Sequence, residues 1–124
     1  MQQITDLIMD EELGGAPFVI LRSFYRQSGG EKALTHEDCY ETFGIVHPAS
    51  PAELELVPEE YRHLPAILIH SPVQLSLGVR QSETEFSGPD RIVYQHSLYL
   101  LILVRDWTHF GFCRGIAVLQ REET

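Results

Sequence analysis

Six histidines and two cysteines are the residues of this chain that most readily suggest metal chemistry. No two histidines have the i, i+4 spacing of a helical zinc motif, and no CxxC pair is present. The run His36-Glu37-Asp38-Cys39 groups four potential ligands but matches no known ligand spacing. The sequence therefore predicts neither a metal site nor a cofactor. The histidines are His36, His47, His63, His70, His96 and His109.

Residue types that could support catalysis do not form a recognised catalytic motif. Asp106 and His109 could exchange a proton, but no GxSxG elbow or other nucleophile motif accompanies them. A tight turn over residues 106–111, in which Asp106 caps its own backbone, is the simpler interpretation. The pairs Gly14-Gly15 and Gly29-Gly30 lack the continuation of a phosphate-binding loop. We therefore expect no catalytic residues and no enzymatic activity.

The charge balance argues against nucleic-acid recognition. The 124 residues contain 9 Lys+Arg and 18 Asp+Glu, for a formal net charge of -9. Residues 1–62 hold twelve acids and four bases, whereas residues 63–124 hold six acids and five bases. A protein that binds duplex DNA usually presents a basic face to the phosphates. The chain also has aromatic residues that could stack on single strands, but it lacks a basic groove beside them.

The length and hydropathy indicate one soluble, intracellular domain. Apolar residues make up 44% of the chain, which is enough for a core. The apolar run Leu98–Val104 has the length of a strand and is too short to span a bilayer. The segment Met1–Asp6 has no feature of a signal peptide. Cys39 and Cys113 are expected to be buried thiols, and a single disulfide is the alternative.

Short apolar segments separated by turn residues predict a mainly antiparallel all-β fold, a small β-barrel of about six strands. Ser50, Pro51 and Glu53 form a capping box, which predicts a short helix inserted between strands. Ile4–Met9 has helix-like apolar spacing but is too short to be stable without docking. The expected strands are 18–27, 39–47, 66–70 (continuing to 75), 91–95, 98–105 and 112–120, with a polar connection at 28–38.

We divide the chain into an N-terminal arm (1–17), a barrel domain (18–121) and a tail (122–124). Within the barrel domain, a long polar loop at 76–90 is expected to have a function or to be ordered by a partner. The segments 66–69 and 98–104 are apolar on both parities, whereas one face of a lone antiparallel sheet should be polar. We expect the inserted helix and a neighbouring subunit to share the burial of the second face.

The order of several weak motifs resembles that of the small head–tail joining proteins of tailed bacteriophages, also called head-completion or stopper proteins. The likeness covers roughly residues 18–120, and the opening strand 18–27 with its Ser28-Gly29-Gly30 break fits the same plan. One departure is Gln95-His96-Ser97, which stands where relatives often carry a glycine in the hairpin turn. The motifs are Phe43–Pro48, Ala49–Leu54, Leu56–Glu59, Ala66–His70, Pro89–Tyr94, Tyr99–Val104, Asp106-Trp107, Gly111-Phe112 and Arg114–Val118.

The resemblance implies a cyclic homo-oligomer in the neck of the virion, assembled from subunits made in the host cytoplasm. Its expected neighbours are the portal–adaptor ring on the head side and the tail terminator on the tail side, with no membrane. Packaged DNA would pass through the channel without sequence-specific binding. A tail terminator or another neck protein is the alternative, and a nucleic-acid-binding barrel or an enzyme is a remoter one.

The family's channel loop corresponds by position to residues 76–88 of this chain. We expect Trp107 and Phe110 to anchor an interface or the end of the barrel. The expected channel or gating residues are Ser76, Arg80, Glu83, Glu85, Phe86 and Gly88.

Overall fold

The structure is a computed structural model that describes residues 15–107 and 112–122. Within these residues, seven strands form one antiparallel sheet, and a short helix with a following 3₁₀ turn connects two of them. The strands are β1 (Gly15–Ser28), β2 (Glu31–Pro48), β3 (Ala66–Ser71), β4 (Glu85–Ser87), β5 (Arg91–Tyr94), β6 (Ser97–Trp107) and β7 (Phe112–Glu122). The helix is α2 (Pro51–Leu54) and the 3₁₀ turn is η2 (Glu59–Tyr61).

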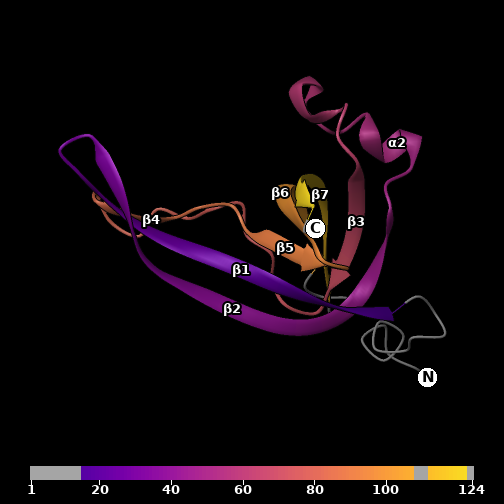
Figure 1. Ribbon diagram of the computed structural model, residues 1–124, viewed down its shortest axis with the longest axis horizontal. Coiled ribbons are helices and arrows are strands. Elements are labelled where there is room, and N and C mark those ends of the chain that lie inside the picture. The colour runs from indigo at the N-terminus through magenta and orange to yellow at the C-terminus, as the bar shows by residue number, and fades with distance from the viewer. Residues whose placement is uncertain (1–14, 108–111, 123–124) are drawn as a thin grey trace.

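The sheet closes on itself. Its order is β2-β3-β7-β6-β5-β1-β4, and an additional β2–β1 pairing joins the ends, so only β4 lies outside the ring. Figure 1 shows the long β1–β2 hairpin running out from this ring as a projecting ribbon. The predicted all-β, mainly antiparallel class is confirmed, with about six strands in the closed part. The predicted N-terminal helical segment lies outside the described residues.

The inserted helix begins where the sequence predicts. The Ser50 hydroxyl accepts from the backbone N–H of Glu53 at 3.2 Å, and the Glu53 carboxylate accepts from the Ser50 N–H at 2.7 Å. Pro51 stands in the first turn. This reciprocal capping satisfies two otherwise unpaired donors of a helix only four residues long. Among the described residues, no helix is long and apolar enough to cross a membrane.

Two apolar clusters lie on opposite faces of the closed sheet. The inner cluster is centred on Ile20, Ile69 and Ile92, which are fully buried. The outer cluster contains residues of β3, β6 and β7, together with apolar residues of the inserted segment 54–64, among them Val57 and Leu64. The inserted segment thus covers part of the outer face, as the two-sided apolar strands predicted. The share expected to be covered by a neighbouring subunit stays a prediction.

The predicted polar connection over residues 31–38 is wrong, because these residues are the first half of β2. β1 and β2 are joined by a two-residue turn at Gly29 and Gly30, whose φ angles are +59° and +84°. Two adjacent glycines with positive φ form the turn that fits the twist of a hairpin. Residues 31–37 of β2 are exposed, so their polar composition is compatible with a strand.

Other boundaries also differ from the expectations. β3 ends at Ser71 and does not continue to Leu75. β6 runs through Asp106 and Trp107, so the chain is still extended where the sequence suggested a turn. The predicted loop 76–90 contains β4. Cys39 and Cys113 do not form a disulfide. Cys113 is buried, but Cys39 is exposed, which corrects the expectation of two buried thiols.

Candidate functional site

The far half of the β1–β2 hairpin, residues 22–37, carries residues 76–90 along one edge; we call these the arm and the docked loop. β4 pairs antiparallel with β1 from Phe24↔Ser87 to Arg26↔Glu85. The arm therefore has three strands where the docked loop adds to it. In Figure 1 the loop follows the hairpin away from the closed sheet. The pairing with β1 therefore fixes the position of this polar loop along the hairpin.

The base of the docked loop is closed by Asp90, which has no exposed side-chain surface. The Arg22 guanidinium donates to both Asp90 carboxylate oxygens, at 2.9 and 2.8 Å. The backbone N–H of Ser76 donates to the same carboxylate at 2.8 Å, and the Asp90 N–H donates to the Ser76 carbonyl at 2.9 Å. One buried carboxylate therefore joins both ends of the loop to β1.

We call the hydrogen-bonded group of Arg22, Asp90 and Ser76 the clamp. Arg22 also makes contacts outside this group. It donates to the carbonyl of Gln74 at 2.8 Å, and its guanidinium lies 5.2 Å from the centre of the Tyr40 ring. The hydrogen bond to Asp90 raises the pKa of Arg22, outweighing the effect of burial. A bidentate pair of this kind fixes orientation as well as distance. The clamp therefore sets the direction in which the loop leaves the closed sheet.

Further contacts hold the loop along the arm. The N–H of Gln27 donates to the Thr84 carbonyl at 2.7 Å, near the tip of the hairpin. The rings of Tyr25 and Phe86 stack with centroids 5.5 Å apart. These contacts leave a run of exposed residues, 77–84, on the outer side of the loop.

The structure brings the six predicted gating residues together in the docked loop, in two environments. Four of them contact the closed sheet or the arm: Ser76, Glu85, Phe86 and Gly88. Ser76 lies in the clamp, Glu85 forms an exposed ion pair with Arg26 at 2.9 Å, and the N–H of Gly88 donates to the Ser23 carbonyl at 3.0 Å.

The other two predicted gating residues, Arg80 and Glu83, are exposed. Arg80 donates to the carbonyl of Glu83 at 3.1 Å. These two residues therefore lie on the exposed outer side of the loop.

The two predicted interface anchors are not tested. Trp107 is the last residue of β6 and pairs with Phe112 through its backbone, but its side chain lies outside the described part of the chain. Phe110 also lies outside the described residues.

Sequence reasoning missed the groups that hold the loop. Arg22 interrupts the apolar parity of Phe18, Ile20 and Phe24, and this was the available signal for a buried ion pair. A second polar cluster on the opposite face of β1 was also missed. There the Ser23 hydroxyl donates to the Glu37 carboxylate at 2.9 Å, and Arg91 donates to both residues.

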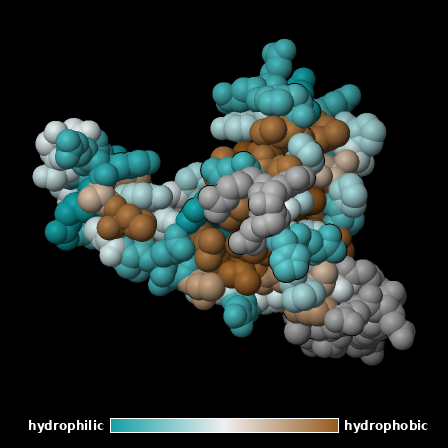
Figure 2. Space-filling model, in the orientation of Figure 1, coloured by the Kyte–Doolittle hydropathy of each residue, from teal (hydrophilic) through white to brown (hydrophobic). Residues whose placement is uncertain are grey.

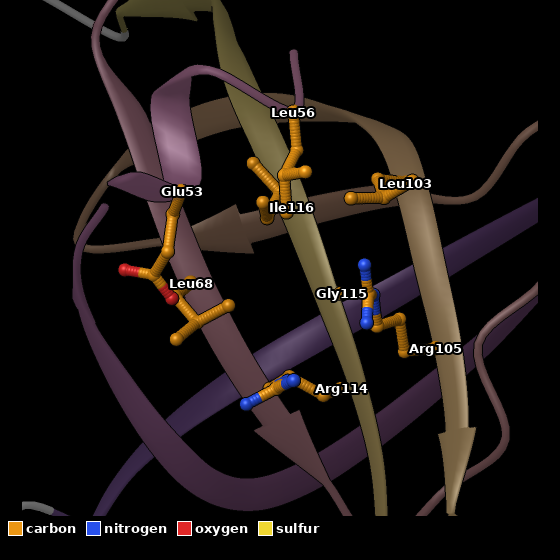
Figure 3. A pocket seen from close by; sticks show the side chains of 8 residues that line it. All are labelled: Glu53, Leu56, Leu68, Leu103, Arg105, Arg114, Gly115 and Ile116. Carbon is orange, nitrogen blue, oxygen red and sulfur yellow. The ribbon is translucent and has the colours of Figure 1, made fainter. Parts of the chain in front are cut away.

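A separate pocket of about 100 Å³ lies on the outer face beside α2, and we call it the α2 pocket. Figure 3 shows that the lining combines the arginines Arg105 and Arg114 with the carboxylate of Glu53 and with apolar side chains. Nearby, the pKa of His70 lies below its usual value because of burial and the charges of His47 and Arg114, with Glu53 acting in the opposite sense. The lining residues are Glu53, Leu56, Leu68, Leu103, Arg105, Arg114, Gly115 and Ile116.

Burial alone would raise the pKa of Glu53. The hydrogen bonds from Ser50 and the charges of His47 and Arg114 outweigh it, so that this pKa is lowered. The part of the chain that the structure describes contains no group of three or more His, Cys, Asp and Glu side chains able to hold a metal ion.

Comparison with known proteins gives little guidance on function. No family model matches the chain. It is similar to an uncharacterized protein of Xylella fastidiosa (strain 9a5c), with 34% identity over 74 residues. The match covers 60% of this chain and 50% of the relative, so the chain aligns with about half the length of that protein.

Proposed function

We propose that this chain is a structural neck protein of a tailed phage, a stopper that forms a ring between the portal–adaptor complex and the tail. In this role it closes the DNA channel after packaging and provides the surface on which the tail docks. The observation that carries the proposal is the docked loop, which is fixed at its base by the buried Arg22–Asp90 pair and exposed along residues 77–84.

The geometry of the loop suits a gate. A gating segment must remain attached to a rigid body while its far side faces the channel. Asp90 supplies the attachment, since it is bonded to both Arg22 and Ser76. Arg80 and Glu83 supply the exposed side. Stopping the genome requires this side to obstruct the channel, and it requires no recognition of bases.

The charge of the chain supports a position beside DNA without tight binding. A formal net charge of -9 repels phosphate, so DNA would slide past such subunits during packaging. The partly uncovered outer face supports assembly into a ring, because a cyclic arrangement buries two different patches of each subunit against its neighbours. Both features support a ring component that encloses the genome.

The test is a loop-excision variant, made in the genome that carries the gene. Because Ser76 and Asp90 are hydrogen-bonded to each other, residues 77–89 can be replaced by two glycines without moving the ends apart. Particles are purified, and electron microscopy and DNA quantification measure the filled heads. We expect the variant subunit to enter particles whose heads then lose DNA. The matched control is Glu60→Gln, an exposed change on η2.

Three results would overturn the proposal. The first is that the protein is absent from purified tailed particles. The second is that the excision variant enters particles that retain their DNA as the control does, which would remove the gate. The third is filled heads with tails of irregular length on loss of the whole gene, which would identify a tail terminator instead.

A further inference from the structure

One edge of the hairpin has no neighbouring strand. Residues 31–44 of β2 pair with β1 on one side, and no described residue pairs with them on the other. β3 occupies that other side only from Ile45 to Pro48. In Figure 1, β2 runs along the side of the hairpin that faces away from β4. The sheet therefore has an open edge beyond the end of β3, and we call residues 36–44 the β2 edge.

The hydrogen bonds of β1 show which of its backbone groups point toward β2. The N–H of Gln27 and the carbonyl of Ser23 both bond to the docked loop, on the side away from β2. Along a strand, successive residues direct their N–H and C=O groups to opposite sides. Phe24 accordingly points toward β2, where the Thr35 hydroxyl donates to its carbonyl at 3.0 Å. Arg22, two residues earlier, points the same way.

The same alternation gives the outward-pointing groups of the β2 edge. Asp38 is opposite Arg22, so its backbone groups point toward β1. Those of Glu37, Cys39 and Glu41 therefore point away from β1, and no described residue bonds to them. Each of these residues has one N–H and one C=O group available for another strand. The β2 edge thus offers regularly spaced donors and acceptors to an extended segment.

The β2 edge lacks the features that usually keep an edge strand unpaired. Such features are proline, lysine, a bulge or a covering loop. The register of β2 shifts at Thr35, but residues 36–44 pair with β1 without interruption. They contain no proline and no lysine. The docked loop lies along the opposite edge of the arm, beside β1. A long, regular and unprotected edge is typical of a site for strand addition.

The charge of the β2 edge distinguishes between possible occupants. The edge contains Glu37, Asp38 and Glu41, and no lysine or arginine. Of these three acids, only Glu37 forms an ion pair with a described residue, Arg91. A second copy added edge to edge would bring two such sets of carboxylates together, and like charges on adjacent strands are destabilising. A strand with lysine or arginine at alternate positions would place positive charges beside them.

We propose that the β2 edge binds an extended basic segment of a different protein by strand addition. Backbone hydrogen bonds to Glu37, Cys39 and Glu41 hold the segment beside β2, beyond the end of β3. The carboxylates of the edge select lysine or arginine at alternate positions of the segment. This inference does not depend on the stopper function, because it concerns the edge of the arm opposite the docked loop.

The first test measures the binding of synthetic peptides to the full-length protein by fluorescence polarisation. The probe alternates valine and lysine and is as long as the β2 edge. One control peptide has glutamate in place of lysine, and another keeps every lysine but has proline in place of two central valines. At an ionic strength of about 0.15 M, we expect both controls to bind at least about tenfold more weakly than the probe. Equal binding of the probe and the proline peptide would show charge attraction without strand addition, and no binding of the probe would exclude the site.

Two variants at one position separate the backbone contact from the charge. Glu41→Pro removes an outward N–H that no described residue uses, and proline is tolerated at such an edge position. It should keep the wild-type Tm and weaken probe binding at least about tenfold. The matched control Glu41→Gln removes the same charge but keeps the N–H, so it should bind the probe more tightly than Glu41→Pro. Equal affinities of the two variants would contradict strand addition.

Amide hydrogen exchange of the wild-type protein locates the bound peptide without any substitution. In the free protein, the amides of Glu37, Cys39 and Glu41 should exchange faster than those of Asp38 and Tyr40, which point toward β1. The probe should slow the first three at least about tenfold. Slow exchange of these three amides without peptide would mean that another part of the chain or a second copy already occupies the edge. A dependence on protein concentration distinguishes these two occupants, and either one overturns the proposal.

Discussion

Asp90 is a buried carboxylate that is completely paired, and this distinguishes it from the exposed acids around it. Its oxygens accept from Arg22 twice and from the backbone of Ser76 once. Replacing it by asparagine keeps the shape but removes the charge, leaving the partly buried guanidinium without its counter-ion. Breaking a buried pair in this way costs about 3–5 kcal/mol.

We therefore predict that Asp90→Asn lowers the free energy of unfolding by several kcal/mol, measured by urea denaturation. The matched control is Glu85→Gln, which breaks the Arg26–Glu85 pair, whose side chains are 61% and 43% exposed. An exposed pair contributes about 0–1 kcal/mol. Equal losses in the two variants would show that the clamp has no special role in stability.

His70 predicts a pH dependence of stability. Its pKa in the folded protein is below the ordinary value of 6.5 because burial and the charges of His47 and Arg114 oppose its protonation, whereas Glu53 favours it. As the pH falls below 6.5, the unfolded chain binds this proton before the folded chain does. The stabilisation is complete above pH 6.5 and is lost as the pH falls toward the folded pKa.

We expect the urea midpoint of the wild-type protein to decrease between pH 7.5 and pH 5.5, and His70→Asn to show a smaller decrease. The midpoints at the two pH values give this comparison directly. The same decrease in both proteins would assign the pH dependence to other groups.

At the scale of elements, the apolar strands and the inserted helix were predictable and the arm was not. Ile67–Ile69 and Leu98–Val104 form strands because their apolar residues are buried or partly buried in the two clusters, and the Ser50–Glu53 box starts the helix. Residues 31–37 pair with β1 through backbone bonds and are exposed, so their hydropathy pattern gives no sign of the pairing. The docked loop was predicted as a segment, but its contact with Arg22 joins residues 68 positions apart, and no local pattern reveals it.

The β5–β6 hairpin contains an unusual turn. Gln95 and His96 both have positive φ, at 49° and 65°, and neither is glycine. The left-handed conformation costs a non-glycine residue about 1–2 kcal/mol, and Asn-Gly is the pair that best suits this two-residue turn. We predict that Gln95→Asn with His96→Gly raises the free energy of unfolding by about 1 kcal/mol, which thermal unfolding measures as a higher Tm.

The control is the opposite kind of change in the β1–β2 turn, where a glycine with positive φ is replaced by alanine. Gly29 has φ +59°, and a Cβ added to it would meet no atom within 4 Å, so Gly29→Ala tests backbone strain without a steric clash. It should lower the Tm. A higher Tm in Gly29→Ala, or no gain in the Asn-Gly variant, would contradict the strain argument.

At the scale of the whole molecule, the outer face is covered unevenly. The α2–η2 segment lies over β3, β6 and β7, where Val57 is buried with Leu68 and Ile116. In Figure 2, apolar surface appears below the hydrophilic residues at the top of the molecule and again on the projecting β1–β2 hairpin and its docked loop. A groove of about 470 Å³ lies between the arm and β5, and its lining includes Leu21, Leu34 and Val93.

This groove is where we expect the neighbouring subunit of the proposed ring to pack. Leu21 is only partly buried in the single chain, so Leu21→Arg should fold with little loss of stability. The charge would be desolvated and unpaired at an interface, which is strongly unfavourable. We predict that the variant has a wild-type Tm but fails to form rings, as measured by analytical ultracentrifugation over a range of concentrations and by its absence from purified particles.

Leu77→Arg, on the exposed side of the docked loop, is the control that should still assemble. If Leu21→Arg assembles as the control does, the groove is not the subunit interface. The apolar outer face of the sheet would then be exposed to water beside the groove.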